Sequence, residues 1–444
     1  MATGRIAVVG GGLAGLSAAV ELKQRGFVVE LLERSRLLGG KATSFKLGDV
    51  EVDNGQHVFL ACCTEFIDFV QHLDGVSPPG EPALFLQERF DALLLARNRA
   101  PARLRAVSLP GPWRLAPALL RYRYLDLPAR LRVGRALLDA RAPARPGETF
   151  AAWLERHGQS AAVRRAFWDP FLVPALNAPL EEVAADAALF VIATAFLGDT
   201  DAARFGFART PLARIAEAAA RGLDQVHLRT PVVGLDLVEQ PPGDPELRAL
   251  VVEDGSHLRY DGVVMAVPPD RLKRVLGRPE RFGVFGLDDI RTAPIVDVHL
   301  WHDAPALGLG FAALLDSPVQ WVFEKAPGYL CCSMSAANQY VNWAGSDLVE
   351  LCRRELGDTL PALRQATLLR GAATRDHEAT FVPSPGLRRP GPATSCARVV
   401  IAGAWTDTGW PATMESAVRS GRAAARTLAA HLAHERNGKE NADG

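Results

Sequence analysis

The chain has 444 residues, of which 48% are hydrophobic and 23% charged, and its 50 lysines and arginines balance its 50 aspartates and glutamates. This composition is typical of a globular protein with core enough for two or three domains, and it gives no overall positive charge for a nucleic-acid partner. The six cysteines follow no disulfide or metal-ligand spacing, and no run approaches the roughly 20 apolar residues of a membrane span.

The first predicted element is a βαβ unit. Arg5–Val9 and Val28–Glu33 have the pattern of buried strands, and Gly12–Arg25 between them has the pattern of a helix that stops at Gly26. A strand that begins so early leaves no room for a signal peptide. We therefore expect a cytoplasmic, metal-free chain with reduced thiols.

The turn between the first strand and the helix fits the pattern G-x-G-x-x-G. Gly10 permits the tight turn, Gly12 lets a pyrophosphate approach the amides of the helix N-terminus, and Gly15 allows close helix–strand packing. Glu33, at the end of the second strand, can accept hydrogen bonds from both ribose hydroxyls. The unit therefore predicts a dinucleotide-binding site.

The segment after Glu33 favours a flavin over a nicotinamide. It runs "RSRLLGGKATSF", and its Gly39-Gly40-Lys41 resembles the continuation E-x(4,5)-L-G-G-[RK] of flavin-linked proteins. The resemblance implies that Gly40 approaches the pyrophosphate and that Lys41 reaches a cofactor phosphate or the flavin edge. It also implies that the loop Asp53–His57, "DNGQH", meets the isoalloxazine ring.

The next region, from Glu81 to Thr210, is rich in arginine, proline and leucine and has helical periodicity. Between Arg97 and Arg145 it holds twelve arginines against two acids, Asp126 and Asp139. Basic residues interleaved with Leu, Trp and Tyr suit the surface of an anionic membrane. A solvated arginine-rich face explains the same pattern, and the sequence leaves both interpretations open.

The later elements alternate between strands and helices. Strand-like runs at 226–238 and 247–269 predict a hairpin turned at Asp254-Gly255 and a strand that ends at Ala266–Pro269. Further elements are expected as strands at Ile295–Trp301, Pro318–Glu324 and Ala397–Trp405, and as helices at Ser346–Leu356 and 412–434.

The C-terminal stretch "IAGAWTDTGWPATMESAVRSGRAAA" resembles the closing motif of flavoproteins. The resemblance implies that Gly403 meets the pyrophosphate and ribityl chain, and that the helix starting near Met414-Glu415 directs its amides at flavin N1/O2. Relatives usually carry an acid after this glycine, where this chain has Ala404. Either Asp407 or a water takes that role, or the cofactor is held less tightly.

Together these segments predict an α/β protein with a discontinuous, Rossmann-like FAD-binding domain of glutathione-reductase type. We assign residues 1–80, 211–270 and 391–435 to this domain, 81–210 and 271–390 to an inserted α+β substrate domain with a membrane-contact candidate at 97–145, and 436–444 to a disordered tail. The residues expected to contact FAD are Gly10, Gly12, Leu13, Ala14, Gly15, Glu33, Arg34, Gly40, Lys41, Gly55, Val232, Ala266, Gly403, Trp405, Met414 and Glu415.

Two motifs that are absent from the sequence exclude one class of flavoprotein, the disulfide reductases. A disulfide reductase would carry C-x4-C after the first helix and a second G-x-G-x-x-G for NADPH, and neither is present. We therefore expect no NAD(P) site and a separate electron donor. The overall plan resembles the amine oxidase and phytoene desaturase superfamily.

Three stretches narrow the resemblance further: "DNGQHVFLACCTE", the block Thr149–Val191 with "FWDPFLVPALN", and "TGWPATMESAVRSG". They resemble the squalene-associated FAD-dependent desaturases, the bacterial hydroxysqualene dehydroxylases of hopanoid precursor synthesis. The resemblance covers nearly the whole chain and is weakest at 81–145. It implies reductive removal of the allylic hydroxyl of hydroxysqualene to give squalene, with synthase enzymes of the same pathway as partners and a location in the cytoplasm or on the inner face of the membrane.

This chemistry needs a proton donor and a dry, aromatic pocket for a cationic intermediate. The candidate donors are His57, Asp169 and Asp407, and the sequence does not choose among them. Asp53 and Asn54 are expected to shape their loop. The candidate substrate-lining residues are Phe167, Trp168, Phe171 and Trp410, although Phe167 and Phe171 fit an ordinary core equally well.

Other functions fit parts of the same pattern. A carotenoid desaturase or isomerase of the phytoene type would share the fold and oxidise a polyene. An amine oxidase would carry an aromatic cage and a flavin-linking cysteine, yet Cys396 precedes the closing strand. A non-catalytic protein that binds flavin and presents isoprenoids to another enzyme is the alternative from a different class.

Overall fold

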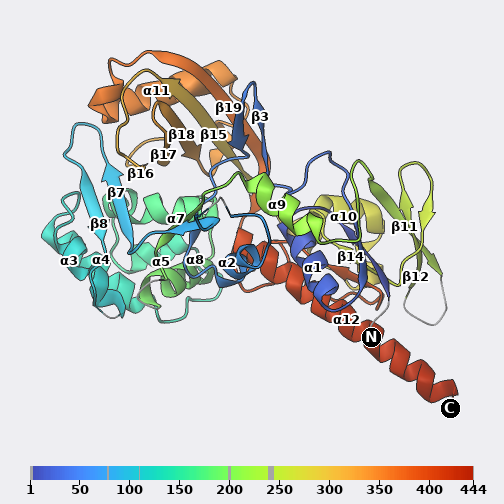
Figure 1. The fold of residues 1–444 in the computed structure, drawn as a ribbon. Helices are drawn as coiled ribbons and strands as arrows, with labels where there is room; N and C mark the ends of the chain where they lie inside the picture. The colour runs from blue at the N-terminus through green and yellow to red at the C-terminus, as the bar shows by residue number, and fades with distance from the viewer. Residues whose placement is uncertain (1–3, 78–79, 110, 199–201, 239–244, 444) are drawn as a thin grey trace.

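The structure is a computed structural model that describes residues 4–77, 80–109, 111–198, 202–238 and 245–443. Figure 1 shows two parts joined side by side. One is built around the blue N-terminal strands and the red C-terminal helix. The other stacks an orange-brown sheet above a layer of cyan and green helices.

A five-stranded parallel sheet forms the centre of the first part, in the order β10-β2-β1-β14-β20. Its apolar strands are buried on both faces, as a parallel sheet requires. All five come from the three segments that the sequence assigns to the FAD-binding domain. Their bounds are β1 Arg5–Val9, β2 Val28–Leu32, β10 Gln225–His227, β14 Gly262–Met265 and β20 Val399–Ile401.

Successive side chains of a strand point to opposite faces of the sheet, and each face packs against different elements. Ile6, Val8 and Val264 point to a core shared with the helices, whereas Ala7 and Val9 point to a core shared with an antiparallel meander. The helices are α1 (Leu13–Gln24), α2 (Thr64–Gln71), α9 (Leu212–Arg221) and α12 (Met414–Asp443). The meander is β11 (Val232–Val238), β12 (Glu246–Val252) and β13 (His257–Leu258), flanked by α10 (Pro269–Leu276). The predicted α/β fold is thereby confirmed.

A seven-stranded sheet dominates the second part, in the order β19-β15-β18-β17-β16-β7-β8. One face packs on α11 (Gly345–Thr359) through Val296, Val298 and Leu300. The other face looks toward the helical layer and the first part (Figure 1). The strands are β7 Asp91–Leu95, β8 Ala102–Arg105, β15 Thr292–His302, β16 Phe311–Leu314, β17 Trp321–Ala326, β18 Tyr329–Met334 and β19 Leu368–Phe381.

The helical layer lies below this sheet. It consists of η1 (Gly111–Leu115), α3 (Ala116–Leu120), α4 (Leu127–Asp139), α5 (Phe150–Arg156), α6 (Ala161–Val163), η2 (Arg164–Trp168), α7 (Asp169–Leu176), α8 (Ala185–Val191) and η3 (Ile192–Leu197). Short 3-10 turns follow elsewhere at η4 (Pro279–Phe282), η5 (Leu287–Asp289), η6 (Ala337–Gln339) and η7 (Pro361–Leu363). No helix in the described ranges combines the length and apolar character that crossing a bilayer requires.

Two expectations about these elements need correction. The region 81–210 is not helical throughout, because β6 (Leu84–Leu86), β7, β8 and β9 (Phe205–Ala208) lie within it. In β8, buried Ala102 and Leu104 alternate with exposed arginines, a period of two that the surrounding arginine-rich sequence obscured. The tail expected to be disordered from residue 436 continues α12 as far as Asp443, since no proline interrupts the helix.

Two small sheets connect the parts. In one, β5 (Phe59–Leu60) pairs with β9, which also pairs with β6. The other is the hairpin of β3 (Ser44–Leu47) and β4 (Val50–Asp53), which leads directly into the loop 53–57. That loop therefore lies where the parallel sheet and the seven-stranded sheet approach each other.

Candidate active site

The glycine-rich turn between β1 and α1 has no room for side chains at two positions. A Cβ on Gly10, whose φ is +106°, would lie 2.3 Å from the carbonyl oxygen of Ala266, and a Cβ on Gly15 would lie 1.9 Å from the carbonyl oxygen of Gly10. The turn, the helix and β14 are thus pressed together, as the sequence predicts for a dinucleotide turn.

Gly12 differs, because a Cβ there would meet only the Cα of Gly40, at 3.9 Å. The second glycine pair is held against the first, since Gly39 N–H donates to the carbonyl oxygen of Gly11 at 2.7 Å. Gly12 and Gly40 therefore leave bare backbone in front of the first-turn amides of α1. Those amides have no partner inside the helix and suit the pyrophosphate of a dinucleotide. We call the site formed by Gly12, Gly40 and the first-turn amides of α1 the glycine cradle.

Glu33 lies at one edge of the glycine cradle. Its carboxylate accepts the N–H groups of Gly11 and Ser35, each at 2.7 Å, so it stands beside the glycine turn where a ribose would arrive. Arg34 is exposed at the same edge. Lys41 extends toward the second part, with Nζ 3.2 Å from the Asp376 carboxylate.

Two other predicted contacts occupy different surroundings. Ala266 touches the glycine turn through its carbonyl oxygen and is partly buried. Val232 is only 3% exposed and packs in the core between the parallel sheet and the meander.

The C-terminal motif folds as a turn clamped onto β14 and α12. A Cβ on Gly403 would lie 2.3 Å from Nε1 of Trp405, and Gly403 N–H donates to Oγ of Ser420 at 3.0 Å. Trp405 is buried and its Nε1 donates to the carbonyl oxygen of Val267 at 3.1 Å. The indole of Trp405 thus fastens the turn to the end of β14.

Met414 begins α12, as the sequence predicts, but the carboxylate of Glu415 points toward α2. This carboxylate is fully buried and accepts Phe66 N–H at 2.8 Å and Glu65 N–H at 3.2 Å, with Arg419 Nε 2.7 Å away. Glu415 therefore caps the first turn of α2 and ties that helix to α12.

The loop 53–57 is held in place by its first two residues. Asp53 accepts the hydroxyl of Ser44 at 2.7 Å and Leu212 N–H at 3.0 Å, and the Asn54 amide donates to the carbonyl oxygen of Lys41 at 3.0 Å. These bonds agree with the loop-shaping role that the sequence predicts for both. They bring Gly55 against the seven-stranded sheet, where a Cβ on it would lie 2.8 Å from Oδ2 of Asp297.

Beneath this loop β15 carries a buried carboxyl group. Asp297 is 3% exposed and lies on the face of β15 opposite Val296 and Val298, which pack toward α11. Its carboxylate oxygen accepts Gln56 N–H at 3.4 Å. Burial in apolar surroundings raises the pKa of Asp297 to about 6, only partly offset by the hydroxyl of Ser333.

His299 continues the same face two residues further along. Its Nδ1 lies 2.8 Å from the hydroxyl of Tyr329 on β18, while its buried Nε2 has no hydrogen-bond partner. Burial lowers the pKa of His299 to about 4, so the ring is neutral at physiological pH. Lys325 on β17 completes the group, with Nζ 2.9 Å from Oε1 of Gln56.

We call Gln56, His57, Asp297, His299, Lys325 and Tyr329 the polar cluster. Of these, the sequence interpretation named only His57, whose pKa is lowered by burial. The missed signal is the run "IVDVHLW", in which Asp297 and His299 stand on one face of an otherwise apolar strand. Buried polar side chains on an apolar strand mark a functional site, because each carries a desolvation cost.

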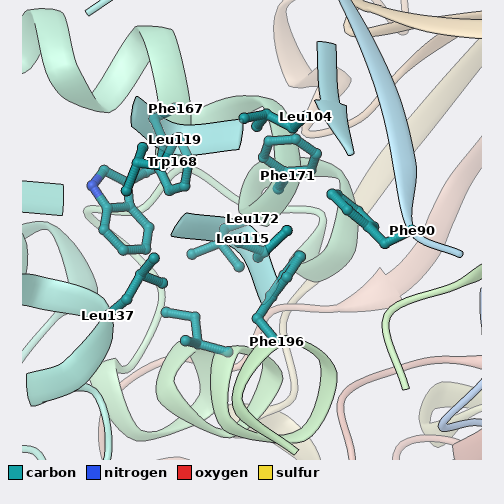
Figure 2. A pocket seen from close by; sticks show the side chains of 11 residues that line it. Phe90, Leu104, Leu115, Leu119, Leu137, Phe167, Trp168, Phe171, Leu172 and Phe196 are labelled. Carbon is teal, nitrogen blue, oxygen red and sulfur yellow. The ribbon is translucent and has the colours of Figure 1, made fainter. Parts of the chain in front are cut away.

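An apolar cavity lies between the sheet and the helical layer (Figure 2). Figure 2 shows the rings of Phe90, Phe171 and Phe196 around the opening, with Phe90 5.5 Å from Phe196 and 6.2 Å from Phe171 between centroids. Its volume is about 30 Å³, room for one or two waters, so a large ligand needs these side chains to move. The lining residues are Phe90, Leu104, Leu115, Leu119, Leu137, Phe167, Trp168, Phe171, Leu172, Ile192 and Phe196.

Aromatic rings connect this cavity to the polar cluster. Phe171 at the cavity lies 6.1 Å from Trp321, which stands on the same face of β17 as Phe323 and Lys325 because strand residues alternate. Phe311 on β16 lies 5.8 Å from Trp321. The sheet face therefore passes from aromatic side chains to polar ones over a few residues of β17.

Three of the predicted site residues lie elsewhere. Trp410 does not line the cavity; its ring packs 5.2 Å from Phe190 and under the guanidinium of Arg419. Asp169 is half-buried, which raises its pKa, but its nearest cationic partner is Arg164 at 3.8 Å and it does not line the cavity.

Asp407 lies on an exposed turn, where it accepts Gly409 N–H and stands 3.6 Å from Arg389. It borders a separate polar hollow of about 170 Å³ beside α12. At Ala404, the backbone carbonyl accepts the hydroxyl of Ser416 at 3.1 Å.

The glycine cradle, the closing turn and the apolar cavity together define the class of flavin-dependent oxidoreductases. The profile of the flavin-containing amine oxidoreductase family matches residues 13–429, and the chain belongs to that family. It is an FAD-dependent oxidoreductase, as the sequence predicts.

Individual relatives resemble the chain over nearly its full length. Hydroxysqualene dehydroxylase of Rhodopseudomonas palustris is 29% identical, covering 95% of this chain and 98% of that protein. The 15-cis-phytoene desaturase of Narcissus pseudonarcissus is 23% identical over 95% of this chain and 79% of its own length. Among solved structures, cyclohexylamine oxidase of Brevibacterium oxydans superposes with a TM-score of 0.71 at 17% identity, covering 97% of this chain and 99% of that one, which shows the fold alone.

Proposed function

We propose that this protein removes the allylic hydroxyl of hydroxysqualene reductively, giving squalene and water. The observation that carries the proposal is the full-length similarity to hydroxysqualene dehydroxylases, together with an apolar aromatic cavity that a row of aromatic rings connects to a buried polar cluster. A long isoprenoid needs few polar anchors, since apolar burial contributes about 25 cal/mol per Å².

The reaction balances as a two-electron reduction. The carbon–oxygen bond breaks, the hydroxyl takes up one proton and leaves as water, and a hydride takes its place on carbon. Reduced FAD, held by the glycine cradle and the closing turn, supplies that hydride when bound. A separate electron donor then has to reduce the flavin again, and an enzyme of the squalene-synthase type would supply the alcohol.

Asp297 is the proton donor that the described residues favour. A hydroxyl is a poor leaving group, so the donor has to carry its proton near neutral pH and stand at the dry side of the flavin loop. Burial raises the pKa of Asp297 to about 6, so a fraction of the molecules carries this proton near neutral pH, and the carboxyl group lies directly under Gly55. Burial lowers the pKa of His57, which disfavours the protonated ring that would have to donate.

The aromatic residues would protect the cation that forms when water leaves. Ring faces stabilise positive charge without attacking it, and a dry pocket prevents water from adding back to the allylic position. Phe171 lines the cavity, Trp321 and Phe323 stand between it and the polar cluster, and these three rings are the candidates for this role.

Product analysis distinguishes this proposal from a phytoene desaturase. The FAD-loaded protein is reduced anaerobically and incubated with hydroxysqualene, and the oxidised protein is incubated with phytoene. We expect squalene from the first incubation and no new conjugated polyene from the second. Unchanged hydroxysqualene together with a visible polyene product would overturn the proposal in favour of desaturation.

A further inference from the structure

Exposed apolar side chains are frequent in one stretch of the chain, the loop before η1 and the helices η1, α3 and α4. The described residues expose fifteen large hydrophobic side chains, and six of them fall between residues 109 and 138. Scattered single exposures are normal on soluble proteins, but a cluster of this kind marks an interaction surface. We call these six the apolar surface: Leu109, Trp113, Leu120, Leu127, Leu131 and Leu138.

Helix α4 shows this surface most clearly because its two faces differ. Leu127 and Leu131 are one turn apart and are 55% and 60% exposed, and Leu138 continues the stripe two turns later. The opposite face, with Val133 and Ala136, is fully buried. Arg130 donates to the carbonyl oxygen of Leu120, so the end of α3 lies directly against α4.

The charges beside this surface are almost all positive. Arg135 lies in the stripe between Leu131 and Leu138, and its side chain is 83% exposed. The acids of this stretch are occupied within the protein: Asp126 caps α4 by accepting Ala129 N–H at 2.8 Å, and Asp139 lies 3.7 Å from Arg135. Further exposed arginines are Arg121, Arg123, Arg132 and Arg141.

The same helices form the wall of the apolar cavity. Leu119 and Leu137 line the cavity, and their chain neighbours Leu120 and Leu138 are exposed on the outside. One helix, about 10 Å thick, therefore separates the cavity from the apolar surface. Figure 1 shows α3 and α4 at the outer end of the molecule, far from the FAD-binding part.

We infer that the apolar surface docks onto an anionic lipid bilayer, on the outer side of the helices α3 and α4 that wall the apolar cavity. Leucines would enter the acyl region while arginines meet anionic headgroups. A second copy of the chain fits less well, because a two-fold contact would place this arginine-rich surface against itself.

Vesicle sedimentation of the full-length, FAD-loaded protein tests this inference. We expect binding to vesicles of phosphatidylcholine with phosphatidylglycerol, weaker binding to phosphatidylcholine alone, and release by salt. The double variant Leu127→Gln/Leu131→Gln should lower the partition coefficient about tenfold or more, because each leucine loses its burial in lipid. Both residues are exposed, so the fold should be unaffected.

The matched control is Phe285→Gln/Leu369→Gln, which changes two side chains of 65% exposure outside this surface and should bind like the wild type. The inference is overturned if the wild type stays unbound, or if the Leu127/Leu131 variant binds equally well. It is also overturned if a dimer forms without lipid and the same variant dissociates it. The vesicle experiment uses no substrate, so its outcome is independent of whether the proposed reaction takes place.

Discussion

At the scale of single residues, Asp297 carries the most specific consequence of this structure. A carboxyl group whose pKa is raised to about 6 can act as an acid while it is protonated, but it costs stability whenever it is ionised inside the protein. Removing the carboxyl group therefore removes the acid, which lowers activity, and also removes the buried charge, which raises stability. Asp297→Asn should therefore lower activity and raise stability together.

The activity prediction concerns the rate of squalene formation. Asp297→Asn should lower kcat by about 10²–10⁴-fold while leaving FAD bound, since only proton donation is lost. In the wild type, the rate should fall as pH rises through about 6, the pKa to which burial raises Asp297. The asparagine variant should lose this dependence; an unchanged rate and pH profile would remove Asp297 from the chemistry.

The stability prediction follows from the same pKa. The folded FAD-free protein binds this proton more tightly than the unfolded chain does, so the stabilisation is complete below about pH 4 and is lost as pH rises through about 6. Removing the carboxylate should raise the free energy of unfolding by about 2–3 kcal/mol at pH 8, with a smaller gain at pH 5. Urea unfolding at both pH values measures the difference, and a loss of stability at pH 8 would contradict it.

Gly12 separates cofactor binding from folding. A Cβ fits there against the protein, yet it would project into the strip of backbone that faces the pyrophosphate. Gly12→Ala should therefore fold normally and lower FAD affinity about tenfold or more, as measured by titration of the FAD-free protein. Gly391→Ala, where a Cβ meets nothing within 4 Å, is the control and should bind FAD normally. Wild-type affinity in Gly12→Ala would place the cofactor elsewhere.

At the scale of elements, the contact between α2 and α12 depends on Glu415. Its buried carboxylate accepts two N–H groups of α2 and pairs with Arg419. Glu415→Ala should lower the free energy of unfolding by about 3 kcal/mol or more, because these buried groups lose their partner. Thermal melts of the FAD-free protein provide the measurement.

The control for Glu415→Ala is the same substitution at Glu350, a glutamate on the surface. Glu350 pairs with Arg353 on α11 with its side chain 59% exposed, and Glu350→Ala should cost about 0–1 kcal/mol. If Glu415→Ala melted like the wild type but lost FAD, the side chain would serve the cofactor rather than α2.

The elements also show what the sequence could and could not predict. The βαβ unit, the hairpin at Asp254-Gly255 and the start of α12 were predicted correctly, because local signals mark each of them. The strands β7 and β8 were missed, since the arginine-rich sequence around them obscured their alternation, and β7 joins the sheet through β16, more than 200 residues away. The polar cluster was missed because nothing local in "IVDVHLW" says which loop will cover Asp297.

At the scale of the whole molecule, the seven-stranded sheet carries both halves of the proposed chemistry on one face. The aromatic half adjoins the cavity, and the polar half lies under the loop that follows the FAD cradle. The sequence predicted an apolar pocket beside a flavin with Trp410 in its lining; in the structure that ring packs against Phe190 and does not line the apolar cavity. The domain boundaries inferred from the sequence stay a prediction.

The most direct measurement is a single turnover of the reduced protein, mixed anaerobically with hydroxysqualene while the flavin spectrum is recorded. We predict that the absorbance of oxidised flavin returns and that one squalene forms for each flavin oxidised, with both changes slowed in Asp297→Asn. A flavin that stays reduced while hydroxysqualene is recovered intact would contradict the account.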